Sequence, residues 1–284
     1  MEESNKSIWE STLSRIVQPP EEKSVFAPLS NARLSVTLIE FREHAWLQPV
    51  LWNACHVYGG LEDVALIVVC GTGNVEYVKQ VTSHLHGVVI KVLPRPNITI
   101  PEYNALLTSS TFYELFEDCP SILLIQTDTL TRKRVPWSYV EQYSYIGAPW
   151  GAPQNGGPPR GVVGNGGYSL RDVAVMKAAC EAFTFDPIAD KAEDLFFAKY
   201  GDGLLKKIAP AHVASTFSVE HVPHPDPCGM HQAWRFHAPQ TLLALLDNLP
   251  GTVASTLPRV EPLQAAASPA AFLLTGMDRK RKML

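Results

Sequence analysis

The chain has 284 residues, of which 46% are hydrophobic and 18% are charged, and this composition is typical of a compact folded protein. Its 24 basic and 28 acidic side chains give a net charge of -4, which offers no electrostatic basis for binding nucleic acid. The five cysteines form no Cys-x-x-Cys pair, a pattern expected of free thiols in a reducing compartment. The acidic N-terminal segment does not resemble a signal peptide, and no apolar stretch reaches the ~18 residues of a membrane span. We therefore expect a soluble, cytoplasmic protein.

Segments of strand length and helix length alternate from residue 34 onward. The apolar, β-rich runs occupy residues 34–41, 64–70, 88–93 and 121–126. The helical segments between them occupy residues 46–58, 74–85 and 101–116. This alternation predicts one α/β domain over residues 31–237, with a Rossmann-like, mainly parallel central sheet and helices on both faces.

The segments that flank this domain differ from it in composition. Residues 1–30 are polar and contain prolines, and we expect them to form an arm. Residues 238–284 are rich in Ala, Leu, Pro and Ser, and apart from a Leu-rich helix at 241–249 we expect a flexible tail with a solvated basic end. Within the domain, the Gly/Pro-dense residues 147–167 predict a functional loop before a helix at 169–183, with a further helix at 192–200.

The carboxyl ends of parallel strands are where an open α/β sheet binds its ligands. These ends lie at residues 40–42, 71–74 and 126–128. Asp128 follows a strongly hydrophobic strand, and a carboxylate there provides hard oxygen ligands for a divalent metal that neutralises a diphosphate. An aspartate at a strand end also commonly caps the next turn, and the residues alone leave both interpretations open.

Three further features carry candidate chemistry. The glycines of residues 163–171 let a ligand approach the backbone closely, although a tight turn with Ser169 as a helix N-cap explains the same pattern. Glu193 and Asp194 open a helix as either a general base or a solvated acidic pair. His231 is a candidate metal ligand or an ordinary polar histidine.

Seven segments of the chain together carry a resemblance to one known family. In order, they read IEFREHAWLQPVLWN, IPEYNALLTS, LLIQTDTL, YIGAPW, GNGGYSLR, AEDLFFA and GMHQAW. The chain resembles, over about residues 34–236, the glycosyltransferase-like family with a GT-A type fold that is known from large algal viruses, bacteria and fungi. The resemblance implies transfer of a sugar from a nucleotide-sugar donor to a glycan or other hydroxyl acceptor, supported by Mn²⁺ or Mg²⁺.

The resemblance also implies roles for individual residues. Residues 126–128 are similar to the D-x-D metal element of the family, with Gln126 in place of the first acid and Asp128 kept as the direct ligand. Glu193 and Asp194 match the acidic pair from which inverting members take their base, here Asp194, and a retaining outcome stays open if Asp194 only orients the acceptor. His231 matches a further metal ligand.

The implied contacts to donor and acceptor follow the same segments. The residues expected to face the nucleotide are Glu40, Phe41, Arg42, Asn104, Gln126, Thr127 and Asp128. The residues expected to form the loop at the sugar and the acceptor are Asn165, Gly166, Gly167 and Tyr168.

Two other functions remain open from the sequence. The substitution at Gln126 is compatible with a pseudoenzyme that binds nucleotide sugars without transferring them. A sugar nucleotidyltransferase is the second alternative, but such an enzyme would carry a Gly-rich, basic loop after its first strand. The corresponding segment here reads EFREHAW and contains no glycine.

Overall fold

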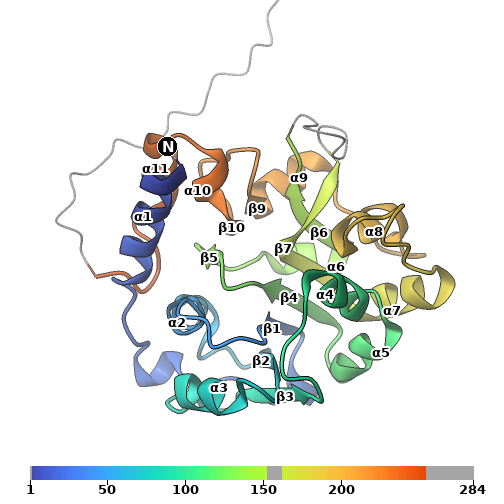
Figure 1. Cartoon of the computed structure of the whole chain (residues 1–284), viewed down its shortest axis with the longest axis horizontal. Helices are drawn as coiled ribbons and strands as arrows, with labels where there is room; N and C mark the ends of the chain where they lie inside the picture. The colour runs from blue at the N-terminus through green and yellow to red at the C-terminus, as the bar shows by residue number, and fades with distance from the viewer. Residues whose placement is uncertain (1, 152–161, 254–284) are drawn as a thin grey trace, which may run out of the picture.

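A computed structural model describes residues 2–151 and 162–253 of the chain (Figure 1). Its central sheet has seven strands in the order β3-β2-β1-β4-β7-β6-β8. Their bounds are β1 Leu34–Ile39, β2 Val64–Gly71, β3 Val89–Leu93, β4 Ser121–Ile125, β6 Tyr143–Pro149, β7 Val163–Asp172 and β8 Lys207–Ile208. β7 pairs antiparallel with both β4 and β6, whereas all the other pairs are parallel. β7 is therefore the one strand of this sheet that runs against the rest.

Helices cover both faces of the sheet. Their bounds are α1 Glu2–Leu13, α2 Leu47–Tyr58, α3 Val75–Thr82, α4 Ile100–Leu107, α5 Ser110–Tyr113, α6 Trp137–Gln142, α7 Val173–Ala182, α8 Glu193–Tyr200, α9 Ala211–Phe217, α10 Ala233–Phe236 and α11 Pro239–Leu246. Side chains on one sheet face, such as Val36 and Leu66, share a core with α1, α2, α3, α9 and α11. Side chains on the other face, such as Ile67 and Leu124, share a core with α4, α5, α7 and α8. The predicted fold class is confirmed, because the strands are apolar on both faces and each face has its own layer of helices.

A second sheet of three short strands lies beside the carboxyl ends of the main strands. Its order is β5-β10-β9, with β5 Thr129–Thr131, β9 Ser218–Val219 and β10 Gly229–His231. β10 pairs antiparallel with β5, in a register that sets His231 opposite Thr129. This pairing brings a late segment of the chain to the end of β4.

The expected helix at 169–183 is wrong in its first part. Residues 163–172 form β7, and the helix begins only at Val173. Its N-cap is Asp172, whose side chain accepts a hydrogen bond from the backbone N–H of Val175, and not Ser169. The strand was not predicted from the sequence, because glycine is uncommon inside strands unless another group approaches the backbone closely. Residues 152–161 of the expected loop lie outside the described residues.

The two flanking segments also differ from the expectation. Residues 2–13, expected within an arm, form α1, which buries Asn5, Trp9, Thr12 and Leu13. These four positions have helical spacing, so a narrow buried face exists within a mostly polar segment. The Leu-rich helix expected at 241–249 is α11, and the rest of the expected tail from residue 254 onward lies outside the described residues. Within the described residues, no helix has the length and apolar character needed to cross a bilayer.

Candidate functional site

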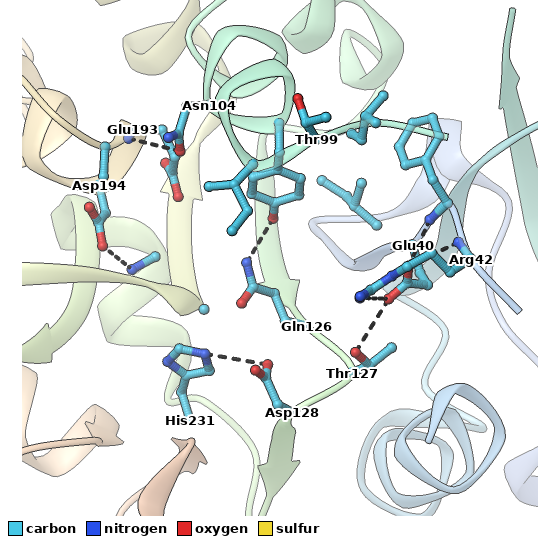
Figure 2. Close-up of a pocket in the computed structure, with 18 of the residues that line it drawn as sticks. Glu40, Arg42, Thr99, Asn104, Gln126, Thr127, Asp128, Glu193, Asp194 and His231 are labelled. Atoms are coloured by element: carbon cyan, nitrogen blue, oxygen red, sulfur yellow. Dashed lines mark hydrogen bonds and ion pairs between the residues drawn. The ribbon is translucent and has the colours of Figure 1, made fainter. Parts of the chain in front are cut away.

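A pocket of about 400 Å³ lies at the carboxyl ends of β1 and β4. Every residue that the resemblance assigns to the site lines it, with the single exception of Tyr168, whereas the strand end at residues 71–74 does not line it. Figure 2 shows Asp128 and His231 together on one side, Glu40 and Arg42 on a second, and Glu193 and Asp194 on a third. The pocket therefore gathers residues that are far apart along the chain, from Ile39 to His231.

Asp128 has its two carboxylate oxygens in different environments. Oδ2 accepts a hydrogen bond of 2.6 Å from Nε2 of Gln232, and the backbone C=O of Asp128 accepts one of 3.0 Å from the backbone N–H of Gln232. Oδ1 lies 3.3 Å from Nε2 of His231. Burial opposes ionisation of Asp128, but His231 and Gln232 outweigh it and lower the pKa of the carboxyl group. The group is thus a fixed carboxylate with one oxygen directed at His231.

His231 is held by a second carboxylate on its far side. Its Nδ1 lies 2.9 Å from Oε1 of Glu220, and because an ionised carboxylate only accepts, Nδ1 carries the hydrogen. Burial lowers the pKa of His231, but Asp128 and Glu220 outweigh burial and raise it to about 10. With this pKa both ring nitrogens carry a hydrogen near neutral pH, and Nε2 directs its hydrogen at Asp128 Oδ1.

The Asp128–His231 pair fits a divalent cation. Asp128 Oδ1 and His231 Nε2 are both buried and form an ion pair with each other at 3.3 Å, and a cation bound between them would displace the proton on Nε2. An imidazole whose other nitrogen donates to a carboxylate, as with Glu220, is the usual arrangement of a metal-ligating histidine. Residues 2–151 and 162–253 contain no group of three or more His, Cys, Asp or Glu side chains that could hold a metal ion. Two protein ligands nevertheless suit a cation that takes its remaining ligands from substrate phosphates and water.

Glu193 and Asp194, at the start of α8, differ sharply in their contacts. Glu193 is buried and forms an ion pair with Arg171 of β7, at 2.9 Å and 3.1 Å between nitrogen and oxygen. Asp194 accepts hydrogen bonds from the backbone N–H groups of Gly166 and Leu195 at 3.2 Å and 2.8 Å. Burial, together with the charge of Glu193, raises the pKa of Asp194 to about 7. Asp194 therefore exchanges a proton near neutral pH, whereas the carboxyl group of Glu193 is engaged by Arg171.

Glu40 and Arg42 form a compact unit after β1. Glu40 Oε1 accepts from the backbone N–H groups of Phe41 and Arg42, and the two carboxylate oxygens accept from Nε and Nη2 of Arg42 at 2.8 Å. Asn74 holds the loop from outside by donating to the C=O groups of Glu40 and Arg42. The Arg42 side chain is 61% exposed, so a positive group remains available at the pocket.

The remaining candidates occupy the floor of the pocket and the wall at α4. Gln126 donates through Nε2 to the hydroxyl of Tyr103 at 3.0 Å. Thr127 donates to Glu40 Oε2 at 3.4 Å. Asn104 accepts from the backbone N–H of Glu193 at 3.3 Å and so links α4 to α8.

The glycines of β7 lie where other groups come unusually close. A Cβ on Gly166 would lie 2.1 Å from Glu193 Oε1, and a Cβ on Gly167 would lie 2.4 Å from the His231 ring. Asn165, which precedes them, accepts from the backbone N–H of Gly167 and lines the pocket. Tyr168, expected in the same loop, is instead fully buried outside the pocket, with its ring 5.3 Å from that of Phe217. Strand geometry explains this, because adjacent side chains of β7 point to opposite faces.

Sequence reasoning did not identify Arg171, Glu220, Gln232 and Tyr103 as site residues. Arg171 is the last residue of the segment GNGGYSLR, and no sequence pattern distinguishes a buried arginine in a strand from an exposed one. Glu220 follows β9, a two-residue strand whose parallel pairing with β10 has no detectable sequence signal. Gln232 could have been predicted as a partner of Asp128, because it directly follows His231 in the sequence.

Residues 88–231 match the model of a family described as "Protein of unknown function (DUF5672)", and this segment is just over half of the chain. The chain belongs to this family. The DUF5672 segment includes Asp128, Asp194 and His231, and it ends at His231, whereas Glu40 and Arg42 lie before it.

Comparison with solved structures finds TarS from S. aureus, residues 1–349, with a TM-score of 0.44 and 11% sequence identity. The alignment covers 75% of this chain and 63% of the TarS chain. A similarity of this size identifies neither an activity nor a substrate. No curated protein matches this DUF5672 chain.

Proposed function

We propose that this protein is a metal-assisted glycosyltransferase that moves a sugar from a nucleoside-diphosphate donor to a hydroxyl acceptor with inversion at the anomeric carbon. The observation that carries the proposal is that two groups of ionisable side chains lie apart within one pocket. Asp128 and His231 form an ion pair at 3.3 Å on one side of the pocket, while Asp194 stands apart from them with a pKa raised to about 7. Such a separation supplies one charged site for a leaving group and one base for a nucleophile.

Asp194 is the residue that we assign to the acceptor. Its carboxylate is fixed by the N–H groups of Gly166 and Leu195 and is half-buried at the pocket wall. In the proposed reaction it takes the proton of the acceptor hydroxyl as that oxygen attacks the anomeric carbon, and the bond to the diphosphate oxygen breaks. A general base is most effective when its pKa lies near the working pH, as the raised pKa of Asp194 does.

Asp128 and His231 are the residues that would hold Mn²⁺ or Mg²⁺. A divalent cation there would act as a Lewis acid that neutralises the charge of the departing nucleoside diphosphate. Arg42 adds a positive group on the donor side, where Glu40 fixes its guanidinium in one orientation. These residues orient the donor, whereas Asp194 acts only on the acceptor.

The test begins with donor binding. A thermal-shift panel of nucleotide sugars, each with and without Mn²⁺, should identify a donor that stabilises the protein more when Mn²⁺ is present. Incubation of that donor with hydroxyl acceptors, followed by NMR of the product, should then show a glycoside of inverted configuration. Binding of the donor without transfer to any acceptor would favour the pseudoenzyme, and release of pyrophosphate from a sugar phosphate and a nucleoside triphosphate would favour the nucleotidyltransferase.

We predict that Asp128→Ala abolishes the Mn²⁺-dependent part of donor binding and leaves the fold intact. Asp128 contributes a carboxylate oxygen to the pocket and little apolar packing, so its loss removes charge and not core volume. The matched control is Asp118→Ala, at an exposed aspartate outside the pocket. If Mn²⁺ still enhances donor binding equally in both variants, Asp128 holds no metal.

A further inference from the structure

The N-terminal helix packs beside the segment that follows His231. Figure 1 shows α1 alongside α10 and α11, although more than 200 residues separate them in the sequence. Asn5 of α1 is 1% exposed, and its side-chain Nδ2 donates to the C=O groups of Trp234 and His237 at 3.0 Å and 2.9 Å. These C=O groups belong to α10 and the residue directly after it, so one buried side chain of α1 fixes both.

A chain of polar contacts continues from α1 to the pocket. Glu2 of α1 pairs with Arg235 of α10 at 3.4 Å, and Nη1 of Arg235 donates to Oε1 of Gln232 at 2.8 Å. The other end of the same amide, Nε2 of Gln232, donates to Asp128 Oδ2. The amide oxygen of Gln232 accepts from Arg235 and the amide nitrogen donates to Asp128. Arg235 therefore fixes the orientation of the Gln232 amide group. That orientation leaves Asp128 Oδ1 as the oxygen facing His231.

The backbone at Gln232 depends on the same neighbours. Gln232 has a φ of 45°, a left-handed conformation that residues other than glycine adopt rarely. It lies between β10, which ends at His231, and α10, which begins at Ala233. A residue held in this conformation requires fixed elements on both sides. On the α10 side, that support comes from Asn5 and from Trp9, whose ring lies 4.6 Å from that of Trp234.

We propose that α1 is a positioning element of the pocket, which acts through α10 to hold Gln232 and thereby the Asp128–His231 pair in its facing geometry. In the proposed function, this pair is the metal site, and the part of the inference that concerns metal affinity rests on that function. Asn5 and Arg235 are positioning residues, because neither contacts the pocket. The inference predicts that a change made in α1 or α10 alters the metal pair and not the Asp194 side.

The test uses the full chain with Arg235→Met and Asn5→Ala, and Arg33→Met as the matched control. Arg33 is 48% exposed and pairs with Glu141, and Arg235 is 49% exposed and pairs with Glu2, so the two arginines lose comparable contacts. Two quantities are measured: Mn²⁺ affinity by calorimetry with Mn²⁺ alone, and the ring ¹⁵N and ¹³C shifts of His231 in histidine-labelled, metal-free protein. Circular dichroism checks that each variant is folded.

Residues that support a metal ligand directly typically cost ~10–100-fold in affinity when lost, and Arg235 acts one contact further away. We therefore expect Arg235→Met to weaken Mn²⁺ binding by at least about threefold and to move the His231 shifts, with Asn5→Ala following the same pattern. Arg33→Met should change neither. Unchanged affinity and unchanged His231 shifts in folded Arg235→Met would overturn the inference, as would equal effects in Arg33→Met.

The two readouts separate this inference from the proposed function. If the parent protein binds no Mn²⁺, the metal role of the pair fails. The His231 shifts then decide alone, and movement in Arg235→Met but not in Arg33→Met supports the positioning role. Because Arg235 is exposed, this variant remains informative even if Asn5→Ala does not fold.

Discussion

Asp194 is an acid of the pocket with a pKa raised to about 7, so its protonation changes near neutral pH. Glu193, its neighbour, forms an ion pair with the buried guanidinium of Arg171. Its negative charge adds to the effect of burial on Asp194, and the result is a pKa of about 7 for that group. Two adjacent acids thus acquire different properties because only one of them has a cationic partner.

We predict that Asp194→Asn lowers kcat by about 10²–10⁴-fold and leaves donor affinity unchanged, because a base that acts on the acceptor contributes mainly in the transition state. In the parent protein, kcat/KM should rise with pH and level off above about 7, as Asp194 loses its proton. Both quantities come from steady-state kinetics between pH 5 and 9. Near-normal turnover in Asp194→Asn would remove this residue from the base role.

The same substitution has a consequence for stability that does not depend on activity. A carboxyl group with a raised folded-state pKa stabilises the fold while protonated, and this contribution is lost as pH rises through about 7. The amide that replaces the carboxyl group carries no charge at any pH, so Asp194→Asn should gain thermal stability relative to the parent between pH 4 and pH 8. Melting temperatures that differ by a constant amount across this range would show that the pKa of Asp194 is not raised.

At the residue scale, the sequence predicted those side chains that terminate strong local patterns. Asp128 follows an unbroken apolar strand, and Asp194 opens a helix with apolar residues behind it. Glu220 and Arg171 could not be predicted, since each is defined by a partner that only the folded chain supplies: His231 for the first and Glu193 for the second. Tyr168 was assigned to the pocket because a loop was expected where a strand forms.

At the scale of elements, β7 supplies part of the wall of the pocket. Because it runs against its neighbours, its N-terminal half lies at the edge where β1 and β4 end. Gly166 and Gly167 therefore reach the pocket, whereas Arg171 lies further along the strand, opposite Ile122 of β4. The two glycines are backed by different groups, Gly166 by Glu193 and Asp194 and Gly167 by the His231 ring.

We predict that alanine at these two neighbouring glycines damages different functions. In Gly166→Ala, the new methyl group meets Glu193 Oε1 at 2.1 Å and Asp194 Cβ at 3.1 Å, so turnover should fall while Mn²⁺ affinity is kept. In Gly167→Ala, the methyl group meets the His231 ring at 2.4 Å, and Mn²⁺ affinity should fall. Kinetics and calorimetry on both variants provide the comparison, with each variant as control for the other. Identical losses in both would mean that β7 is simply distorted.

The parallel strands of the first half and the helices α2 and α3 were predictable because their apolar residues repeat with the period of the element. The single helix expected at 101–116 is wrong, because the chain breaks there into α4 and α5. β1, β2, β3 and β4 all lie within the predicted runs or differ by one residue. β7 was not predictable in this way, since glycines interrupt its pattern and its two neighbours in the sheet come from different parts of the chain. The short strands β9 and β10 have too few residues to show any period.

At the scale of the whole molecule, the first and last described segments join. Val17 donates its N–H to the C=O of Gly251, and Val253 donates to the C=O of Arg15. Next to this pairing, α11 buries Leu242, Leu245 and Leu246 in the core that also contains Trp9 of α1. Residues up to 253 are therefore part of the packed structure, well beyond the predicted domain end at 237.

We predict that Leu245→Ala lowers the free energy of unfolding by about 2–5 kcal/mol, because a fully buried leucine leaves a cavity when truncated. Leu243→Ala is the matched control, since Leu243 lies on the same helix and is only partly buried. Urea unfolding followed by tryptophan fluorescence measures both. Equal, small losses would indicate that α11 does not form part of the core in solution.

The pairing of α1 with α10 has a consequence for synthesis of the protein. The hydrogen bonds of Asn5 to α10 and to the residue after it span 229 and 232 residues. At the usual translation rates of about 5–20 residues per second, on the order of 10–50 s pass between the synthesis of Asn5 and that of Trp234. During this time the ribosome holds a chain in which Trp9 has no aromatic partner from α10. The part of the apolar face of α1 that packs on Trp234 therefore has no partner until α10 has been synthesised.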